Sequence, residues 1–164
     1  MIIIGIDPGT IVCGYGIILM KGSTIQVLDY GCIRPPKKEK LSQRYLAIFQ
    51  SIDDLLNRYT PDALIVETQY VKHNVQSAIK LGMARGTVIV AAANKGVLIY
   101  EYSPSEAKMA VCGSGRATKK QMQYMIMQLL HLSDLPLEDS ADALALALCH
   151  LHGMNKQWLR RVEV

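Results

Sequence analysis

The order of short apolar runs along this chain limits its fold more than any other feature. The first three runs are separated by little more than turn residues, among them Pro8-Gly9 and Lys21-Gly22. Such short connections join antiparallel strands. The later runs alternate with helical segments, which is the pattern of strands joined by helical crossovers. The strands are therefore expected at residues 2–6, 15–20, 24–33, 63–66 and 97–100.

Helical periodicity and end signals complete this pattern. Apolar residues recur at helical spacing from Leu41 to Leu56, and Thr60-Pro61 ends that segment. Ser103 and Glu106 have the spacing of a capping box. The other helices are expected at 77–94, 118–132 and 137–152. The fold class is therefore α/β, a five-stranded mixed sheet with its first three strands antiparallel and helices on both faces. Residues 1–164 are expected to form one domain, with a short basic tail from about residue 153.

Composition excludes several other classes of protein. Of the 164 residues, 50% are hydrophobic and 20% charged, which is typical of a globular chain and not of a disordered one. No apolar run approaches the length of about 20 residues that spans a membrane, and no secretory signal is recognisable, so a cytoplasmic location is expected. Four widely spaced cysteines exclude the common zinc spacings and indicate scattered buried thiols, at Cys13, Cys32, Cys112 and Cys149.

Positive charge is concentrated in the middle of the chain. Residues 1–67 are neutral overall, residues 68–120 carry a net charge of +6, and residues 121–164 carry −2. We call residues 68–120 the basic block. Such a block suits a polyanion such as DNA, although a solvated basic face without a partner explains the charge alone equally well. Its candidate phosphate contacts are Lys72, Lys80, Arg85, Lys108, Arg116, Lys119 and Lys120.

Four acidic residues stand where acids are costly. Asp7 ends the first apolar run and Glu67 ends the fourth, while Asp139 and Asp142 open the last helix on one face. Asp7 as a turn residue and Asp139 as a helix-start residue have ordinary explanations. Glu67 does not, because a carboxylate at the end of a buried strand needs a partner. We refer to these residues as the four acids.

The four acids would repel one another if they met, and a divalent cation would remove that repulsion. Oxygen ligands without a supporting cysteine or close histidine pair favour Mg²⁺ or Mn²⁺. Two such ions about 4 Å apart are the usual device for attacking a phosphodiester. The sequence alone shows only that the four acids are able to meet.

Four motifs in order along the chain also resemble one family. They are Ile4-Gly5-Ile6-Asp7-Pro8-Gly9-Thr10 with Gly14-Tyr15-Gly16, then Val66-Glu67, then the Ser77–Gly86 segment, and last Asp139-Ser140-Ala141-Asp142-Ala143-Leu144-Ala145. Together they resemble the RuvC family of Holliday junction resolvases. The resemblance implies a ribonuclease-H-like fold, a homodimer, and paired Mg²⁺-dependent cutting of four-way DNA junctions. It also implies a partnership with a branch-migration motor, the RuvA and RuvB proteins.

The resemblance assigns roles to particular residues. It implies that the four acids are the catalytic residues and hold two Mg²⁺ ions per site, with Mn²⁺ as a possible substitute. It implies that Tyr70 contacts DNA near the junction centre, and that Lys108 and Lys119 lie beside the active site. The family's glycine-containing loop is recognisable at Gly113-Ser114-Gly115-Arg116.

Other residues admit two interpretations. Gly82 and Gly86 lower helix stability by about 1 kcal/mol each relative to alanine, so they favour a close approach, either to a second copy or to the protein's own sheet. His150 and His152 are interpreted as helix-end residues and not as metal ligands.

Three other functions compete with the nuclease. The actin-like and sugar-kinase ATPases also begin with a strand and a D-x-G-T motif, but they need a second phosphate loop and a second domain, for which 164 residues leave no room. A non-catalytic junction-binding module and a dimeric scaffold are the others, and the presence of all four acids counts against the module.

Overall fold

Five strands form one mixed sheet in the computed structural model, which describes residues 1–68 and 75–154. The sheet has the order β3-β2-β1-β4-β5, and β1 pairs antiparallel with β2 and parallel with β4. The prediction of a mixed sheet with an antiparallel start is confirmed. The strands are β1 (Ile2–Asp7), β2 (Cys13–Lys21), β3 (Thr24–Ile33), β4 (Ala63–Glu67) and β5 (Leu98–Tyr102).

The five helices also agree with the expected segments, with differences at their ends. The predicted capping box is confirmed, because Ser103 and Glu106 cap α3 reciprocally. The predicted helix 118–132 is shorter, because Thr118 is the N-cap of α4 and His131 adopts a positive φ of 52° just beyond its end. The helices are α1 (Leu41–Tyr59), α2 (Val75–Asn94), α3 (Pro104–Cys112), α4 (Lys119–Leu129) and α5 (Glu138–Met154).

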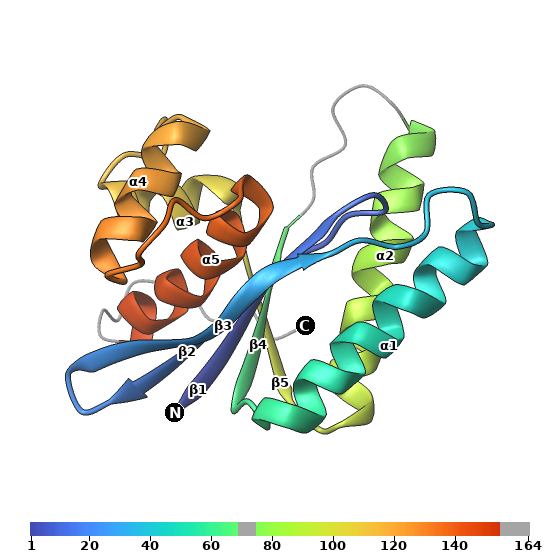
Figure 1. Cartoon of the computed structure of the whole chain (residues 1–164), viewed down its shortest axis with the longest axis horizontal. Coiled ribbons are helices and arrows are strands. Elements are labelled where there is room, and N and C mark those ends of the chain that lie inside the picture. Colours follow the sequence, from blue (N-terminus) through green and yellow to red (C-terminus); the bar gives the residue numbers. More distant parts are fainter. Residues whose placement is uncertain (69–74, 155–164) are drawn as a thin grey trace.

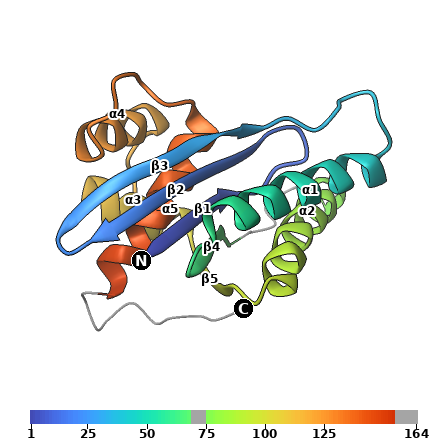
Figure 2. The same cartoon turned by 60° about the horizontal axis from the view of Figure 1, so that its bottom comes forward.

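The sheet is the middle of three layers. Helices α1 and α2 cover one face, and α3, α4 and α5 cover the other, as Figures 1 and 2 show. Alternate residues of β1 divide between the two cores, because successive strand side chains point to opposite faces. Ile3 packs toward α5, while Ile4 and Ile6 pack toward α1 and α2.

No helix within the described residues is both long enough and apolar enough to cross a membrane.

Helix α5 is almost entirely buried. Its residues from Ala143 to Cys149 are at most 1% exposed, because α5 is enclosed by the sheet, α3 and α4.

Candidate active site

Parallel pairing places Asp7 and Glu67 next to each other. Ile6 of β1 pairs with Val66 of β4, so the residue that follows on each strand lies at the same edge of the sheet. This edge is where the carboxyl ends of β1, β4 and β5 meet. The first two of the four acids, which are 60 positions apart in the sequence, are thus brought together by backbone pairing.

The start of α5 is brought to the same edge by glycines in β1 and β2. Gly14 lies opposite Asp7 in the ladder, and a Cβ atom at Gly14 would overlap the carbonyl group of Asp139. A Cβ at Gly16 would come within 2.6 Å of the Leu144 side chain. The missing side chains let α5 lie directly on the strands, with its first turn over the end of β1.

A cavity of about 290 Å³ opens where these elements meet. Asp7, Glu67 and Asp142 line it, each from a different element. Asp139 is not among its lining residues, although its backbone lies against Gly14. Three of the four acids therefore share one cavity and the fourth lies beside it. The remaining lining residues are Pro104, Ala107, Lys108, Lys119 and Met122.

The pKa values of these carboxyl groups show how closely they interact. The pKa of Asp7 is raised to about 8, first by burial and then by the negative charges of the other three acids. Burial and the charge of Asp142 raise the pKa of Glu67 to about 7. The pKa of Asp142 is raised to about 6, mainly by burial, while Lys119 opposes the shift. Each of these acids is thus poorly compensated by the protein alone.

Uncompensated carboxylates are the donor set that a hard divalent cation prefers. Within residues 1–68 and 75–154, no three histidine, cysteine or acidic side chains are oriented so as to hold one ion together. The backbone brings the acids to one cavity, and their shared charge fits a divalent cation by donor chemistry. The described side-chain orientations do not form a coordination sphere.

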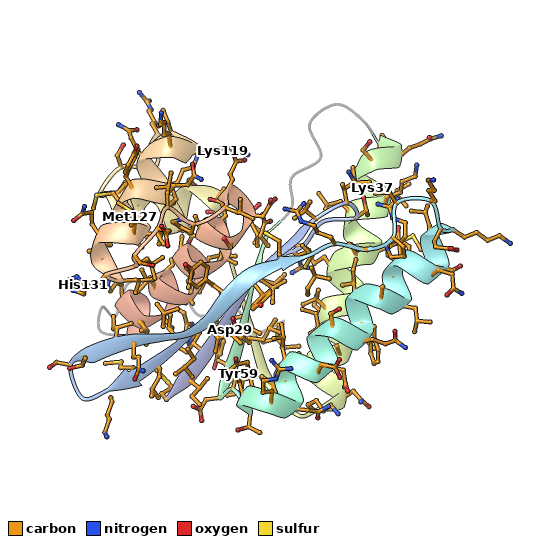
Figure 3. The ribbon with its side chains drawn as sticks, viewed as in Figure 1. Asp29, Lys37, Tyr59, Lys119, Met127 and His131 are labelled. Carbon is orange, nitrogen blue, oxygen red and sulfur yellow. The ribbon has the colours of Figure 1, made fainter. Side chains whose placement is uncertain are left out.

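Two of the predicted basic residues lie at this cavity. Lys108 of α3 and Lys119 of α4 line it, and both oppose the rise in the pKa of Glu67. Lys119 also forms an ion pair with Glu138 at the start of α5. Figure 3 shows Lys119 extending from the start of α4 toward the start of α5. The cavity therefore combines carboxylates with two cations, an arrangement suited to a phosphate group and its metal.

The other predicted DNA contacts lie elsewhere. Lys80 on α2 and Lys120 on α4 are exposed, and Arg116 is exposed beside a separate hollow between α3 and α4. Arg85 forms an ion pair with Glu101. Tyr70 and Lys72 lie outside the described residues.

The structure shows how His150, close to the end of α5, is packed. This residue is buried at 3% exposure, and its Nδ1 is 3.0 Å from the Tyr102 hydroxyl. Its ring also packs on that of Tyr100. Helix α5 continues beyond it to Met154, so His150 faces β5 within the core.

Among the described residues, the two glycines of α2 have no close neighbour outside their own helix. A Cβ at Gly82 or Gly86 would meet none of those residues within 4 Å. The alternative that these glycines pack against the protein's own sheet is therefore wrong, because the side of α2 that carries them points away from the sheet.

Some residues that shape the site were missed. Gly5 is one, because a Cβ there would overlap the Ala143 carbonyl oxygen of α5. Met122 is another, since it is 1% exposed and forms part of the cavity wall. A glycine in the middle of an apolar strand is a signal for close packing that the sequence already carried.

The fold and the site together define a class of protein. A mixed sheet of this order, with helices on both faces and carboxylates at the ends of β1 and β4, defines a ribonuclease-H-like fold.

A family model described as crossover junction endodeoxyribonuclease RuvC matches residues 3–150, and this chain belongs to that family. The crossover junction endodeoxyribonuclease RuvC of Protochlamydia amoebophila is 56% identical over 151 residues, which make up 92% of this chain and 90% of that relative. The structure of Thermus thermophilus RuvC is 31% identical and has a TM-score of 0.88 over the full length of both chains. A second structure, with 29% identity and the same TM-score and coverage, shows T. thermophilus RuvC in complex with a Holliday junction substrate.

Proposed function

We propose that this protein resolves four-way DNA junctions by metal-dependent hydrolysis of two symmetric phosphodiester bonds. One observation carries the proposal: acids from β1, β4 and α5 share a cavity with Lys108 and Lys119. Family membership and the junction complex of the T. thermophilus relative support the choice of substrate. The sequence resemblance led to the same function.

The four acids are the proposed ligands of the metal ions. We propose Mg²⁺ as the natural ion, two per site, with Mn²⁺ as a substitute. When bound, these ions supply an activated water molecule and stabilise the leaving oxygen. Asp7, Glu67, Asp139 and Asp142 would hold the ions. Burial, and after it the charges of neighbouring acids, raise the pKa values of Asp7, Glu67 and Asp142, and a bound cation would relieve this cost.

Lys108 and Lys119 are the proposed phosphate contacts at the cut. Both reach the cavity from helices on the same side of the sheet, so they offer positive charge to a phosphate beside the acids. The ion pair with Glu138 holds Lys119 at the start of α5. Lys80, Arg116 and Lys120 are proposed contacts farther along the DNA. Tyr70 and Lys72 keep the roles predicted for them, outside the described residues.

The proposed homodimer uses the outward face of α2. Large apolar side chains on this helix are highly exposed, at 58% for Ile79, 52% for Met83 and 59% for Val90. Their spacing places them on one side of the helix with Gly82 and Gly86. Among the described residues nothing covers the two glycines within 4 Å. We call this surface the α2 face, and a second copy is its proposed occupant because two matched sites suit the symmetry of a four-way junction.

Cleavage of a labelled four-way junction, compared with a linear duplex of the same sequence, tests the proposal directly. We expect cutting of the junction with Mg²⁺ or Mn²⁺, none with a chelator, and little cutting of the duplex. The Asp7→Asn variant, purified in the same way, controls for a contaminating nuclease. Equal cutting by the wild type and this variant would contradict the proposed mechanism, and binding without cutting by the wild type would favour the junction-binding module.

We also propose a place for the protein in the cell. Family membership supports a partnership with a branch-migration motor, the RuvA and RuvB proteins. The proposed DNA substrate supports a cytoplasmic location, and four free cysteines fit a reducing compartment. Co-purification of RuvA or RuvB with the tagged protein in the presence of junction DNA tests the partnership.

A further inference from the structure

Arg85 of α2 has two contacts at the end of β4. Its Nε donates a hydrogen bond to the backbone carbonyl oxygen of Glu67 at 3.3 Å, and its guanidinium forms an ion pair with the carboxylate of Glu101 on β5. The Arg85 and Glu101 side chains are 20% and 26% exposed. A single side chain thus connects α2, the end of β4 and β5.

The contact between Arg85 and the Glu67 carbonyl lies at the end of β4, where the strand pairing of the sheet ends. Glu67 is the last residue of β4 and pairs with Tyr102, the last residue of β5. One further backbone hydrogen bond, from Thr68 N to the Tyr102 carbonyl oxygen, measures 2.9 Å. The Arg85 guanidinium holds the Glu67 peptide from the α2 side, so it restrains the backbone that carries this carboxylate.

We propose that Arg85 is a positioning residue for Glu67 and that Glu101 orients Arg85 for this task. The inference rests on the proposed function and deepens it, because Glu67 is a proposed metal ligand. Arg85 is less suited to bind a DNA phosphate than to position Glu67, because Glu101 already compensates its charge. Groups that orient a metal ligand commonly change metal affinity or activity by about 10–100-fold when they are removed.

Arg85→Gln and Glu101→Gln test the proposal in the full-length protein. We expect each variant to cut the four-way junction about 10-fold more slowly. Junction affinity, measured with Ca²⁺ in place of Mg²⁺, should stay within about twofold of the wild type. The double variant should be no slower than either single one, because both residues act through one contact. Arg85→Lys should recover little of the lost cleavage rate, because an ammonium group does not bind the Glu67 carbonyl and the Glu101 carboxylate together as the guanidinium does.

Mn²⁺ binding provides a readout that does not depend on cleavage. We expect the Mn²⁺ concentration at half-saturation, measured by calorimetric titration of the metal-free protein, to be about 10-fold higher in both variants than in the wild type. If the wild type binds Mn²⁺ but cuts no junction, the proposed function fails, and this titration still decides the role of Arg85.

Asp53→Asn is the matched control. Asp53 pairs with Lys95, its side chain is 24% exposed, and the substitution changes the charge as Glu101→Gln does. This variant should cut and bind Mn²⁺ as the wild type does. The proposal is overturned if Arg85→Gln keeps the wild-type rate and Mn²⁺ midpoint. It is also overturned if Glu101→Gln keeps both, or if junction affinity falls as much as the rate.

Discussion

At the level of a single residue, the carboxyl group of Asp7 shows most clearly how costly the candidate site is for the metal-free protein. Burial and three neighbouring acids raise its pKa to about 8, so at neutral pH the metal-free protein holds either a proton or an unfavourable charge there. Among the described residues, the positive charge of Lys119 opposes this rise in the pKa of Asp7. A residue kept at such a cost indicates a ligand or a reaction that uses its charge.

Asp7→Asn should separate stability from activity. The amide removes the charge while keeping the shape, so we expect cleavage to fall by about 100-fold or more and junction binding to persist. The metal-free variant should be more stable than the wild type at pH 8, by about 1–3 kcal/mol. Gel-based cleavage and urea unfolding measure the two effects. A variant that cuts normally would remove Asp7 from the mechanism.

The same pKa values predict how the stability of the metal-free protein depends on pH. A raised pKa means that the folded state binds more protons than the unfolded state between the two values. For Asp7 this window extends from about 4 to about 8, so the stability supplied by the protonated group is lost as the pH rises. Thermal unfolding in a chelator should therefore show a falling Tm across this range, and Mg²⁺ should restore Tm at pH 8. An unchanged Tm with Mg²⁺ would argue against a metal at the acids.

Among the helices and strands, the position of α5 depends on glycines in β1 and β2, which carry no side chains. Gly5, Gly14 and Gly16 provide a surface without side chains on which the helix lies, and this surface brings Asp139 and Asp142 to the strand ends. The helix itself is held by burial between Ala143 and Cys149. The position of the second pair of acids is therefore determined by glycines far away in the sequence.

Gly5→Ala should destabilise the protein, because the new methyl group would overlap the Ala143 carbonyl oxygen of α5. We expect a loss of about 1–3 kcal/mol in the free energy of unfolding, as for other overpacked cores. Gln50→Ala, at an exposed position of α1, is the control and should change the free energy of unfolding by less than about 0.5 kcal/mol. Urea titration of both variants measures the contrast. Equal stability of the two would contradict the close contact of α5 with the sheet.

At the level of the whole molecule, the candidate active site and the α2 face lie on different sides of the sheet. The acids are at the sheet edge toward α3, α4 and α5, whereas α2 covers the opposite face, as Figure 1 shows. Arg85 spans these layers by its contact with the Glu67 carbonyl. A partner on the α2 face would therefore contact the same helix whose Arg85 restrains Glu67.

Ile79→Glu should break the proposed homodimer without unfolding the protomer, because Ile79 is 58% exposed. We expect a monomer in sedimentation experiments, together with single nicks in place of paired cuts in a cruciform plasmid. Leu129→Glu, at an exposed position at the end of α4, is the control and should leave the oligomeric state unchanged. A dimeric Ile79→Glu variant would place the interface elsewhere.

Much of the fold followed from local signals. Turn residues after β1 and β2, helical spacing in α1 and the Ser103 cap of α3 act over a few residues, and the structure confirms each of them. The spacing of apolar residues does not fix the ends of helices. Helix α4 ends at Leu129, and His131 just beyond it adopts a positive φ that no apolar spacing reveals. Side-chain partners were also hidden, as the burial of His150 against Tyr102 shows.

The sequence by itself determined which segments become strands and helices and that four acids stand at their ends, because hydrophobic period and turn chemistry are local properties. Only the tertiary structure decided that Asp7, Glu67 and Asp142 share one cavity, and that Arg85 binds Glu101 and the Glu67 carbonyl. Those neighbours depend on strand order and on the close approach of α5 to glycines. Both are set by packing between residues that are distant along the chain.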